Sequence, residues 1–171
     1  PICEDIWSPD VIECLEESGA ELLLVSNSSP FESGKPDVRL NHVVARVTES
    51  NLPLVYVNQV GGQDELVFDG SSFVIDSDRK LRAQLPSWEE DFAITKWRRN
   101  ESGSWSCDQE TIREAPGELA SIYQAALLGL RDYVEKNGFP GVILGLSGGI
   151  DSALSAAIAV DALGPDRVRC V

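Results

Sequence analysis

Apolar and polar positions in the first half of the chain alternate between helical and strand-like spacing. Residues 8–17 carry apolar side chains on one side, with Ser8 as the expected N-cap, Pro9 at the first helical position and Gly19 as the stop. From Pro36 to about Glu49 the apolar positions again follow helical spacing, which predicts a second helix. Short apolar runs predict strands at residues 21–25, 52–60, 65–68, 72–75 and 81–85, with turns at 61–62, 69–70 and 76–79 between the later ones. Two helices beside several strands indicate an α/β layer architecture.

The pattern changes in the second half of the chain. Residues 86–116 show no sustained periodicity and are predicted to be a connector, in which residues 92–94 are apolar enough for an outlying strand. Apolar positions at i, i+3 and i+4 then predict an amphipathic helix from Leu119 to Val134 that ends before Gly138. The elements expected next are a strand at 142–146, a glycine-rich loop at 147–152, a helix to Leu163 with Gly164 as C-cap, and a strand from Val168. This order is that of a parallel βαβ unit.

Composition and charge exclude several classes of protein. Hydrophobic residues make up 43% of the chain, which is enough for a packed core. No segment has the roughly 20 uncharged apolar residues of a membrane span, and the start lacks the basic and apolar regions of a signal peptide. The formal net charge of -14 at pH 7 would repel a phosphate backbone. We therefore expect neither a membrane nor a nucleic-acid partner.

The cysteines and the absence of methionine indicate the setting of the chain. Cys3, Cys14, Cys107 and Cys170 form no CxxC pair and are too sparse for a disulfide scaffold or a zinc site. We expect a reducing, cytoplasmic environment, in which Cys14 and Cys107 have no chemical role and Cys170 lies in the core. Because the chain has no methionine, it has no initiator residue, and we expect it to be an excerpt of a longer polypeptide.

The loop at residues 147–152 (SGGIDS) has the composition of a phosphate site. It lies between a predicted strand and a helix, where open α/β sheets bind ligands. Gly148 and Gly149 let the backbone approach a ligand, and the helix N-terminus favours an anion. The loop has neither the GK[ST] of a Walker A motif nor G-x-G-x-x-G, and Asp151 would repel phosphate unless a cation such as Mg²⁺ lay between them. The alternative is a glycine turn in which Asp151 and Ser152 only cap the helix.

Cys3 is a candidate nucleophile because it lies just before a capped helix. The positive end of a helix dipole favours the thiolate, and backbone N–H groups at such a corner can stabilise an oxyanion. The alternative is a buried, inert cysteine. His42, the single histidine, is far along the chain from Cys3. A Cys/His dyad is therefore not expected, and any base is a different residue or lies outside these residues.

Both motifs resemble known families. Residues 146–153 (LSGGIDSA) resemble the pyrophosphate loop of the N-type ATP pyrophosphatases, which cleave ATP to AMP and pyrophosphate. Residues 2–7 (ICEDIW) resemble the nucleophile segment of nitrilase-superfamily amidases, which use a Glu-Lys-Cys triad. With residues 27–30 (NSSP), 34–35 (GK) and 58–70 (NQVGGQDELVFDG), the whole series resembles the glutamine-dependent NAD+ synthetases. In that family a nitrilase-type glutaminase precedes an N-type pyrophosphatase domain.

This resemblance implies roles for particular residues. Cys3 would attack the carboxamide of glutamine to give a glutamyl thioester and ammonia, and the backbone N–H of Glu4 would be a candidate oxyanion donor. Ser29 and Lys35 would bind glutamine; the alternatives are a turn hydroxyl and a solvated lysine. The residues implied in ATP binding are Gly145, Leu146, Ser147, Gly148, Gly149, Ile150, Asp151 and Ser152, of which Asp151 would hold Mg²⁺. The family's triad Glu and Lys precede the cysteine and are expected before Pro1.

The resemblance also implies a fold and an activity. The fold class is α/β: the C-terminal part of a nitrilase-like α-β-β-α sandwich at residues 1–97, a connector at 98–116, and the first βαβ unit of a Rossmann-like pyrophosphatase domain at 117–171. The expected full-length protein is a homo-oligomer that uses ATP and ammonia from glutamine to convert deamido-NAD+ to NAD+. The alternatives are a nitrilase-type amidase fused to another ATP-dependent amide ligase, and a fragment without catalytic activity.

Overall fold

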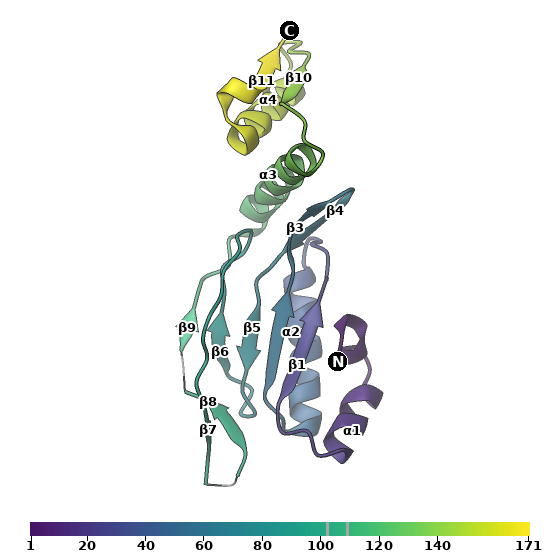
Figure 1. Cartoon of the computed structure of the whole chain (residues 1–171), viewed down its shortest axis with the longest axis vertical. Helices are drawn as coiled ribbons and strands as arrows, with labels where there is room; N and C mark the ends of the chain where they lie inside the picture. Colours follow the sequence, from purple (N-terminus) through teal and green to yellow (C-terminus); the bar gives the residue numbers. More distant parts are fainter. Residues whose placement is uncertain (102, 109) are drawn as a thin grey trace.

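The chain folds into an elongated α/β structure with a sheet towards one end and a small βαβ unit at the other (Figure 1). The computed structural model describes residues 1–101, 103–108 and 110–171; residues 102 and 109 of the predicted connector lie outside the described residues. The helices are η1 (Cys3–Ile6), α1 (Asp10–Glu17), α2 (Lys35–Ser50), α3 (Glu118–Lys136), α4 (Ile150–Leu163) and η2 (Pro165–Arg167), where η denotes a 3-10 helix. The strands are β1 (Leu23–Asn27), β2 (Leu54–Asn58), β3 (Val60–Gln63), β4 (Leu66–Asp69), β5 (Phe73–Ile75), β6 (Leu81–Gln84), β7 (Trp97–Arg99), β8 (Trp105–Cys107), β9 (Thr111–Ile112), β10 (Val142–Leu144) and β11 (Val168–Cys170).

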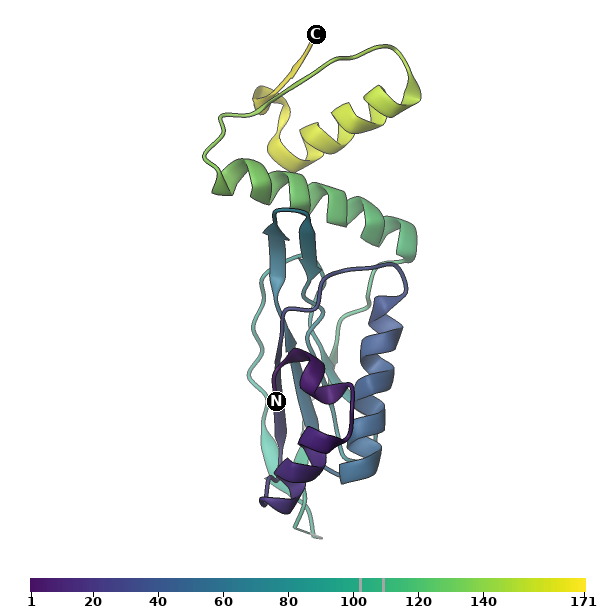
Figure 2. The ribbon, with the colours of Figure 1, turned by 90° about the vertical axis from the view of Figure 1, so that its right-hand side faces the viewer.

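The main sheet has the strand order β1-β2-β5-β6-β9. β1 runs parallel to β2 and β6 runs parallel to β9, whereas β2, β5 and β6 pair in antiparallel fashion. Helices α1 and α2 cover one face of the sheet (Figure 2). Burial along β1 alternates accordingly: Leu23 and Val25 are buried, and Leu24 between them is exposed. A sheet covered by two helices is the α/β layer architecture that the sequence predicts.

Two apolar clusters stabilise this part of the chain. The smaller consists of Val74, Ala83 and Cys107, with Trp97 packed against it, and joins the β7–β8 hairpin to the sheet. Burial of one Val, Leu or Ile side chain contributes about 1.5–3 kcal/mol, so the larger cluster dominates. Its buried members, from η1, α1, α2 and the sheet, are Ile6, Ile12, Leu23, Val25, Val43, Val47, Leu54, Tyr56, Phe73 and Ile75.

Strands β3 and β4 form a hairpin that extends beyond the sheet, and α3 crosses it (Figures 1 and 2). The prediction of a turn at Gly61 and Gly62 is wrong: both residues lie in β3, and the turn is at Asp64 and Glu65. A Cβ atom at Gly62 would lie 3.1 Å from the Cα of Gly129 on α3. Glycine is therefore needed for the close approach of two backbones and not for a turn.

Other predictions succeed or fail according to how local their signal is. The helices α2 and α3 lie where periodicity predicts them, and α4 lies where a helix ending at Leu163 is expected after the glycine loop. The first helix begins at Asp10, with Pro9 as N-cap in place of the predicted Ser8. Residues 92–94 form no strand, whereas β7, β8 and β9 were not predicted. β9 is a strand because it pairs with β6. It is too short to show a periodic pattern of its own, so its sequence does not predict it.

The C-terminal part is the predicted βαβ unit. β10 and β11 pair in parallel and α4 connects them, with Gly149 as its N-cap and Gly164 as its C-cap. Cys170 is exposed, so the prediction that it lies in the core is wrong; two strands with one helix cannot bury both faces of a sheet. None of the helices in the described ranges combines the length and the apolar character that crossing a bilayer requires.

Candidate functional site

Polar side chains meet where two parallel strands of the main sheet end. β1 ends at Asn27 and β2 at Asn58, and these two residues are partners in the strand register. Ile2 pairs in parallel with Ser26, so Cys3 leaves the sheet at the same edge. Ligands of open α/β sheets bind outside the carboxyl ends of parallel strands, so the topology places Cys3 where a binding site is expected.

The backbone of Cys3 has an uncommon conformation. Its φ of 46° lies in the left-handed region, which costs a residue with a Cβ atom on the order of 1–3 kcal/mol and is concentrated at functional sites. The Asp5 carboxylate accepts the N–H of Ile2 at 2.6 Å, and the Asp5 N–H donates to the Ile2 carbonyl at 3.1 Å. These two bonds close the turn that contains Cys3 and hold its backbone in place.

A pocket of about 250 Å³ brings Cys3 together with Ser29 and Lys35, the two residues that the resemblance assigns to glutamine. Glu4 is not part of its lining; the Glu4 side chain is exposed and its carbonyl accepts the N–H of Trp7 at 2.9 Å. A thiol, a hydroxyl and an ammonium group among apolar walls suit a small ligand with polar ends. The other lining residues are Ile6, Trp7, Asn27, Val38, Arg39, His42 and Tyr56.

Lys35 reaches this pocket from the first turn of α2. Gly34 before it has a φ of 78°, which turns the chain into the helix. The Lys35 Nζ atom lies 2.6 Å from Glu32 Oε1, and this hydrogen bond holds the pKa of Glu32 below its usual value. Because the Glu32 side chain is 67% exposed, the pair contributes little to folding. A ligand carboxylate could therefore replace Glu32 beside the ammonium group at small cost.

His42 lies in the Cys3 pocket although it is far from Cys3 along the chain. The helix α2 runs back along the sheet and brings His42 beside Trp7, and the two rings stack with their centroids 6.0 Å apart and 16° between their planes. Within the residues that the structure describes, no hydrogen bond links the Cys3 thiol to the His42 ring. His42 thus forms part of the pocket wall, but it does not make the hydrogen bond with the thiol that a Cys/His dyad needs.

Tyr56 lines the pocket from β2. It is 3% exposed, and its ring stacks on Phe73 at 4.8 Å between centroids. Burial raises the pKa of Tyr56, against smaller opposing effects of the Arg39 charge and of a hydrogen bond with Ser29. The phenol therefore stays protonated at neutral pH. It presents an O–H group to the Cys3 pocket and does not act as a base there.

Several residues of this pocket were not found by sequence patterning, although signals for some of them exist. Asn27, which lines the pocket, and its strand partner Asn58, which does not, each end an apolar run, and polar residues that end neighbouring parallel strands meet at one edge. Arg39 precedes Val43 by one helical turn on the apolar face of α2, where a buried charge requires a partner. Tyr56 is one of many apolar positions in the sheet, and nothing local distinguishes it.

The glycine loop joins β10 to α4 as predicted. Gly148 has a φ of 82°, which favours glycine, and Gly149 is the N-cap of α4. The hydroxyls of Ser147 and Ser152 lie 3.2 Å apart, and Ser152 Oγ donates to the Gly149 carbonyl at 3.0 Å. Residues 145–151 are exposed. The start of α4 is therefore accessible to an anion.

Asp151 is an exposed acidic residue in the first turn of α4. No group of three or more His, Cys, Asp or Glu side chains among the described residues could hold a metal ion. Mg²⁺ commonly keeps several waters and is bound by one or two carboxylates together with substrate phosphates. A Mg²⁺ ion at this loop would therefore need a phosphate chain as well as the Asp151 carboxylate.

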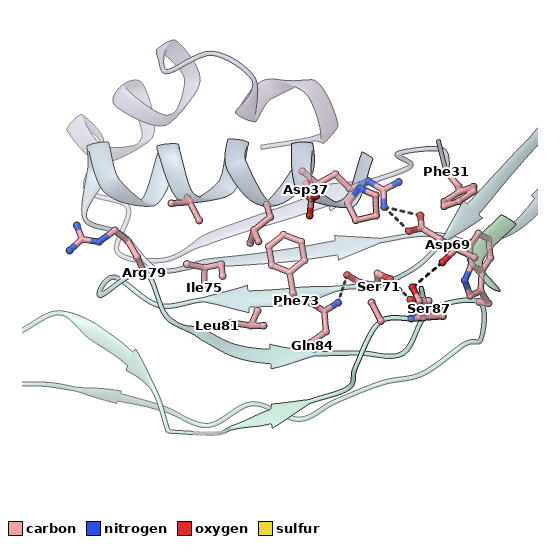
Figure 3. Close-up of a pocket in the computed structure, with 18 residues that line it drawn as sticks. Phe31, Asp37, Asp69, Ser71, Phe73, Ile75, Arg79, Leu81, Gln84 and Ser87 are labelled. Carbon is pink, nitrogen blue, oxygen red and sulfur yellow. Dashed lines mark hydrogen bonds and ion pairs between the residues drawn. The ribbon is translucent and has the colours of Figure 1, made fainter. Parts of the chain in front are cut away.

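A second cavity, of about 340 Å³, lies between α2 and strands β5 and β6 (Figure 3). Phe73 and Ile75 line its apolar middle, Asp69 lies towards one end, and Arg79 lies at the other (Figure 3). None of the residues that the resemblance assigns to a site lines this cavity. Arg39 lines both this cavity and the Cys3 pocket, so its side chain separates the two.

Comparison with known proteins gives two family matches and many relatives. Residues 1–106 match the carbon-nitrogen hydrolase family, and residues 122–171 match the NAD synthase family. The chain is 49% identical over 171 residues to the glutamine-dependent NAD(+) synthetase of Rhodobacter capsulatus, of which it covers 31%. It is 45% identical over 170 residues to the glutamine-dependent NAD(+) synthetase of Acinetobacter baylyi, of which it also covers 31%.

A solved structure resembles the chain over nearly its whole length. The glutamine-dependent NAD+ synthetase from Acinetobacter baumannii, in complex with adenosine diphosphate, superimposes with a TM-score of 0.88 and 47% identity over 99% of this chain and 32% of that one. The chain thus spans about a third of the length of the relatives it matches. The two family matches follow each other in the order that the Cys3 segment and the glycine loop predict. The chain therefore belongs to the carbon-nitrogen hydrolase family, and its residues 122–171 match the NAD synthase family.

Proposed function

We propose that the chain is the part of a glutamine-dependent NAD+ synthetase that contains the cysteine nucleophile, the glutamine pocket and the pyrophosphate loop. The observation that carries the proposal is the meeting of Cys3, Ser29 and Lys35 in one pocket, within the residues that match carbon-nitrogen hydrolases. The NAD synthase match in the same chain supports the second half of the reaction. Relatives of up to 49% identity bear this name.

In the first half-reaction the Cys3 thiolate attacks the carboxamide carbon of glutamine. The thiol proton passes to a base and then to the leaving nitrogen, so that ammonia departs and a glutamyl thioester remains, which water hydrolyses to glutamate. The hydrogen-bonded turn fixes the thiol, and the backbone N–H of Glu4 is the candidate donor to the oxyanion. The Ser29 hydroxyl and the Lys35 ammonium group bind glutamine, whose carboxylate replaces Glu32 beside Lys35.

In the second half-reaction ATP converts the carboxylate of deamido-NAD+ to an adenylate, pyrophosphate leaves, and ammonia displaces AMP. Residues 145–152 bind the phosphates with the exposed backbone at the start of α4. Asp151 would hold Mg²⁺, and the ion would supply positive charge beside the phosphates. Preorganised donors of this kind are each typically worth about 100- to 1,000-fold in rate.

We also propose the organisation and setting of the protein. Residues 1–97 belong to the glutaminase domain, 98–116 to a connector and 117–171 to the start of the synthetase domain. The partners are the small molecules glutamine, deamido-NAD+ and ATP, and the net charge of -14 supports the absence of a nucleic-acid or membrane partner. The protein acts in the cytoplasm as a homo-oligomer.

The experiment that tests the proposal separates the two nitrogen sources. In the full-length protein, Cys3→Ala is expected to abolish NAD+ synthesis from glutamine and to leave synthesis from added ammonia, because Cys3 serves only nitrogen release. Cys14→Ala, at an exposed cysteine on α1, is the matched control and keeps both activities. Equal loss of both activities in Cys3→Ala would refute this division of labour, and synthesis of a different amide would identify another ATP-dependent ligase.

A further inference from the structure

Arg39 is a buried arginine whose guanidinium nitrogens all have partners beside the Cys3 pocket. It is 6% exposed, and its Nη1 atom lies 2.8 Å from both carboxylate oxygens of Asp69, which is 2% exposed. Its Nε donates to Ser29 Oγ at 3.0 Å, and its Nη2 donates to the carbonyls of Ser29 at 2.7 Å and Pro30 at 3.0 Å. Two of the three nitrogens thus hold the segment that carries the Ser29 hydroxyl.

The network constrains every polar group of Ser29. The Ser29 N–H donates to Asn58 Oδ1 at 3.0 Å, and the Ser29 carbonyl also accepts from Asn58 Nδ2 at 3.3 Å. A serine hydroxyl has one proton and two acceptor positions, and Arg39 Nε fills one of these positions. The Ser29 proton is then left to donate towards the Cys3 pocket, which Ser29 lines.

Asp69 completes the network from the end of β4. A buried guanidinium without a carboxylate would be an uncompensated charge, and the Asp69 carboxylate, whose two oxygens both accept from Arg39 Nη1, removes this cost. Asn58 Nδ2 lies 3.5 Å from Asp69 Oδ1, so β2 and β4 are joined at the same point. Figure 3 shows Asp69 accepting the two bonds beside the second cavity.

We propose that Arg39 and Asp69 are positioning residues for the amide substrate of Cys3, and that they act through Ser29 by fixing its hydroxyl as a hydrogen-bond donor to an acceptor oxygen of that substrate. The inference rests on the proposed function of the pocket and deepens it. A donor held in place before binding loses less conformational freedom when the ligand arrives, so its effect is on substrate affinity and orientation. Neither Arg39 nor Asp69 needs to touch the substrate.

The test is a double-mutant cycle on glutamine kinetics in the full-length protein. Ser29→Ala and Arg39→Lys are each expected to raise KM for glutamine roughly tenfold or more, the range for loss of a hydrogen bond to a charged or preorganised group. Because Arg39 acts through Ser29, the double variant is expected to be within about twofold of Ser29→Ala. Synthesis from added ammonia stays unchanged in all three variants, which shows that the protein is folded. Multiplied effects in the double variant would overturn the proposal.

A second variant and a matched control cover the case in which Arg39→Lys disturbs the fold. Asp69→Asn keeps the size of the side chain and frees the Arg39 guanidinium, and it is expected to raise KM for glutamine in the same way. Arg82→Lys is the control: Arg82 Nε pairs with the buried Asp76 at 3.1 Å, away from the Cys3 pocket, and KM for glutamine stays at the wild-type value. An unchanged KM in Asp69→Asn would overturn the inference. If Cys3→Ala also kept its glutamine-dependent activity, the proposed function itself would fail.

Discussion

The Asp132 carboxylate on α3 accepts the N–H of Gly62 in β3 at 2.7 Å, although 70 positions separate the two residues in the sequence. Lys136, one helical turn further, donates to the Gly62 carbonyl at 2.6 Å and lies 3.2 Å from Asp132. Side chains of α3 thus satisfy both backbone groups of Gly62 in β3. An unpaired strand edge would otherwise be open to other chains, so α3 both packs on the hairpin and protects it.

Replacement of Gly62 should therefore weaken the contact between α3 and the hairpin. We expect Gly62→Ala to lower the free energy of unfolding by about 1–3 kcal/mol, because the new Cβ atom would lie 3.1 Å from the Cα of Gly129 and 3.2 Å from the Cβ of Asp132. Urea denaturation measures the change. Gly145→Ala is the control, since nothing lies within 4 Å of its added Cβ atom. Equal stability of the two variants would show that close packing at Gly62 is unimportant.

Gly62 also shows what the sequence pattern could not predict. Two adjacent glycines are typical of a turn and of close backbone approach, and the information that decides between them lies in Gly129 and Asp132 on a helix far along the chain. The periodic helices α2 and α3 were predictable because their signal is contained in their own residues. Strands such as β9 depend on a distant partner, and local patterning does not contain it.

The candidate site divides in the same way. The motif residues Cys3, Ser29 and Lys35 were identified from short segments, and the fold brings them into one pocket. The residues that position these three, Arg39 and Asp69, were not predicted. The place of Arg39 on α2 indicates a buried charge, but nothing in the sequence pattern indicates that Asp69 is its ion-pair partner. His42 lines the same pocket, which its distance from Cys3 along the chain does not indicate.

Asp151 provides a test of the glycine loop. In the full-length protein, Asp151→Asn should impair synthesis with glutamine and with ammonia, and should raise the Mg²⁺ concentration needed for half-maximal rate. The reason is that a carboxylate beside a polyphosphate is expected to bind the cation that neutralises the phosphate charge. Steady-state rates across a Mg²⁺ titration measure the effect. Asp166→Asn, which removes the same charge from the exposed η2 helix, is the control. Normal rates with an unchanged Mg²⁺ requirement would restrict Asp151 to capping α4.

The raised pKa of Tyr56 predicts the behaviour of the chain at alkaline pH. Its pKa in the folded state lies above the ordinary value of 10.0, chiefly because of burial, so the unfolded state releases the proton first. Stability is therefore intact below pH 10 and falls as the pH rises from there towards the folded-state pKa, with a slope of up to about 1.4 kcal/mol per pH unit from this group. Urea denaturation between pH 9 and 11 should show a shallower fall for Tyr56→Phe than for the wild type. Tyr133→Phe, at a half-exposed tyrosine on α3, is the control and should keep the steeper fall.

The last prediction concerns residues 1–171 on their own, which we expect to release no ammonia from glutamine. Acyl transfer to a thiol needs a proton acceptor within hydrogen-bond reach. No carboxylate lines the Cys3 pocket among the described residues. The basic groups there are engaged elsewhere: Lys35 with Glu32, Arg39 with Asp69. His42 stacks on Trp7, and Tyr56 stays protonated.

Loss of the base from such a site typically removes several orders of magnitude in rate, so activity at background level is expected. The measurement is ammonia release by the purified 171-residue chain, with Cys3→Ala as the background. Turnover above this background would mean that the base lies within the chain, and His42→Ala and Lys35→Met would then show which of the two residues supplies it. Such a result would overturn the expectation, implied by the family resemblance, that the triad's Glu and Lys precede Pro1.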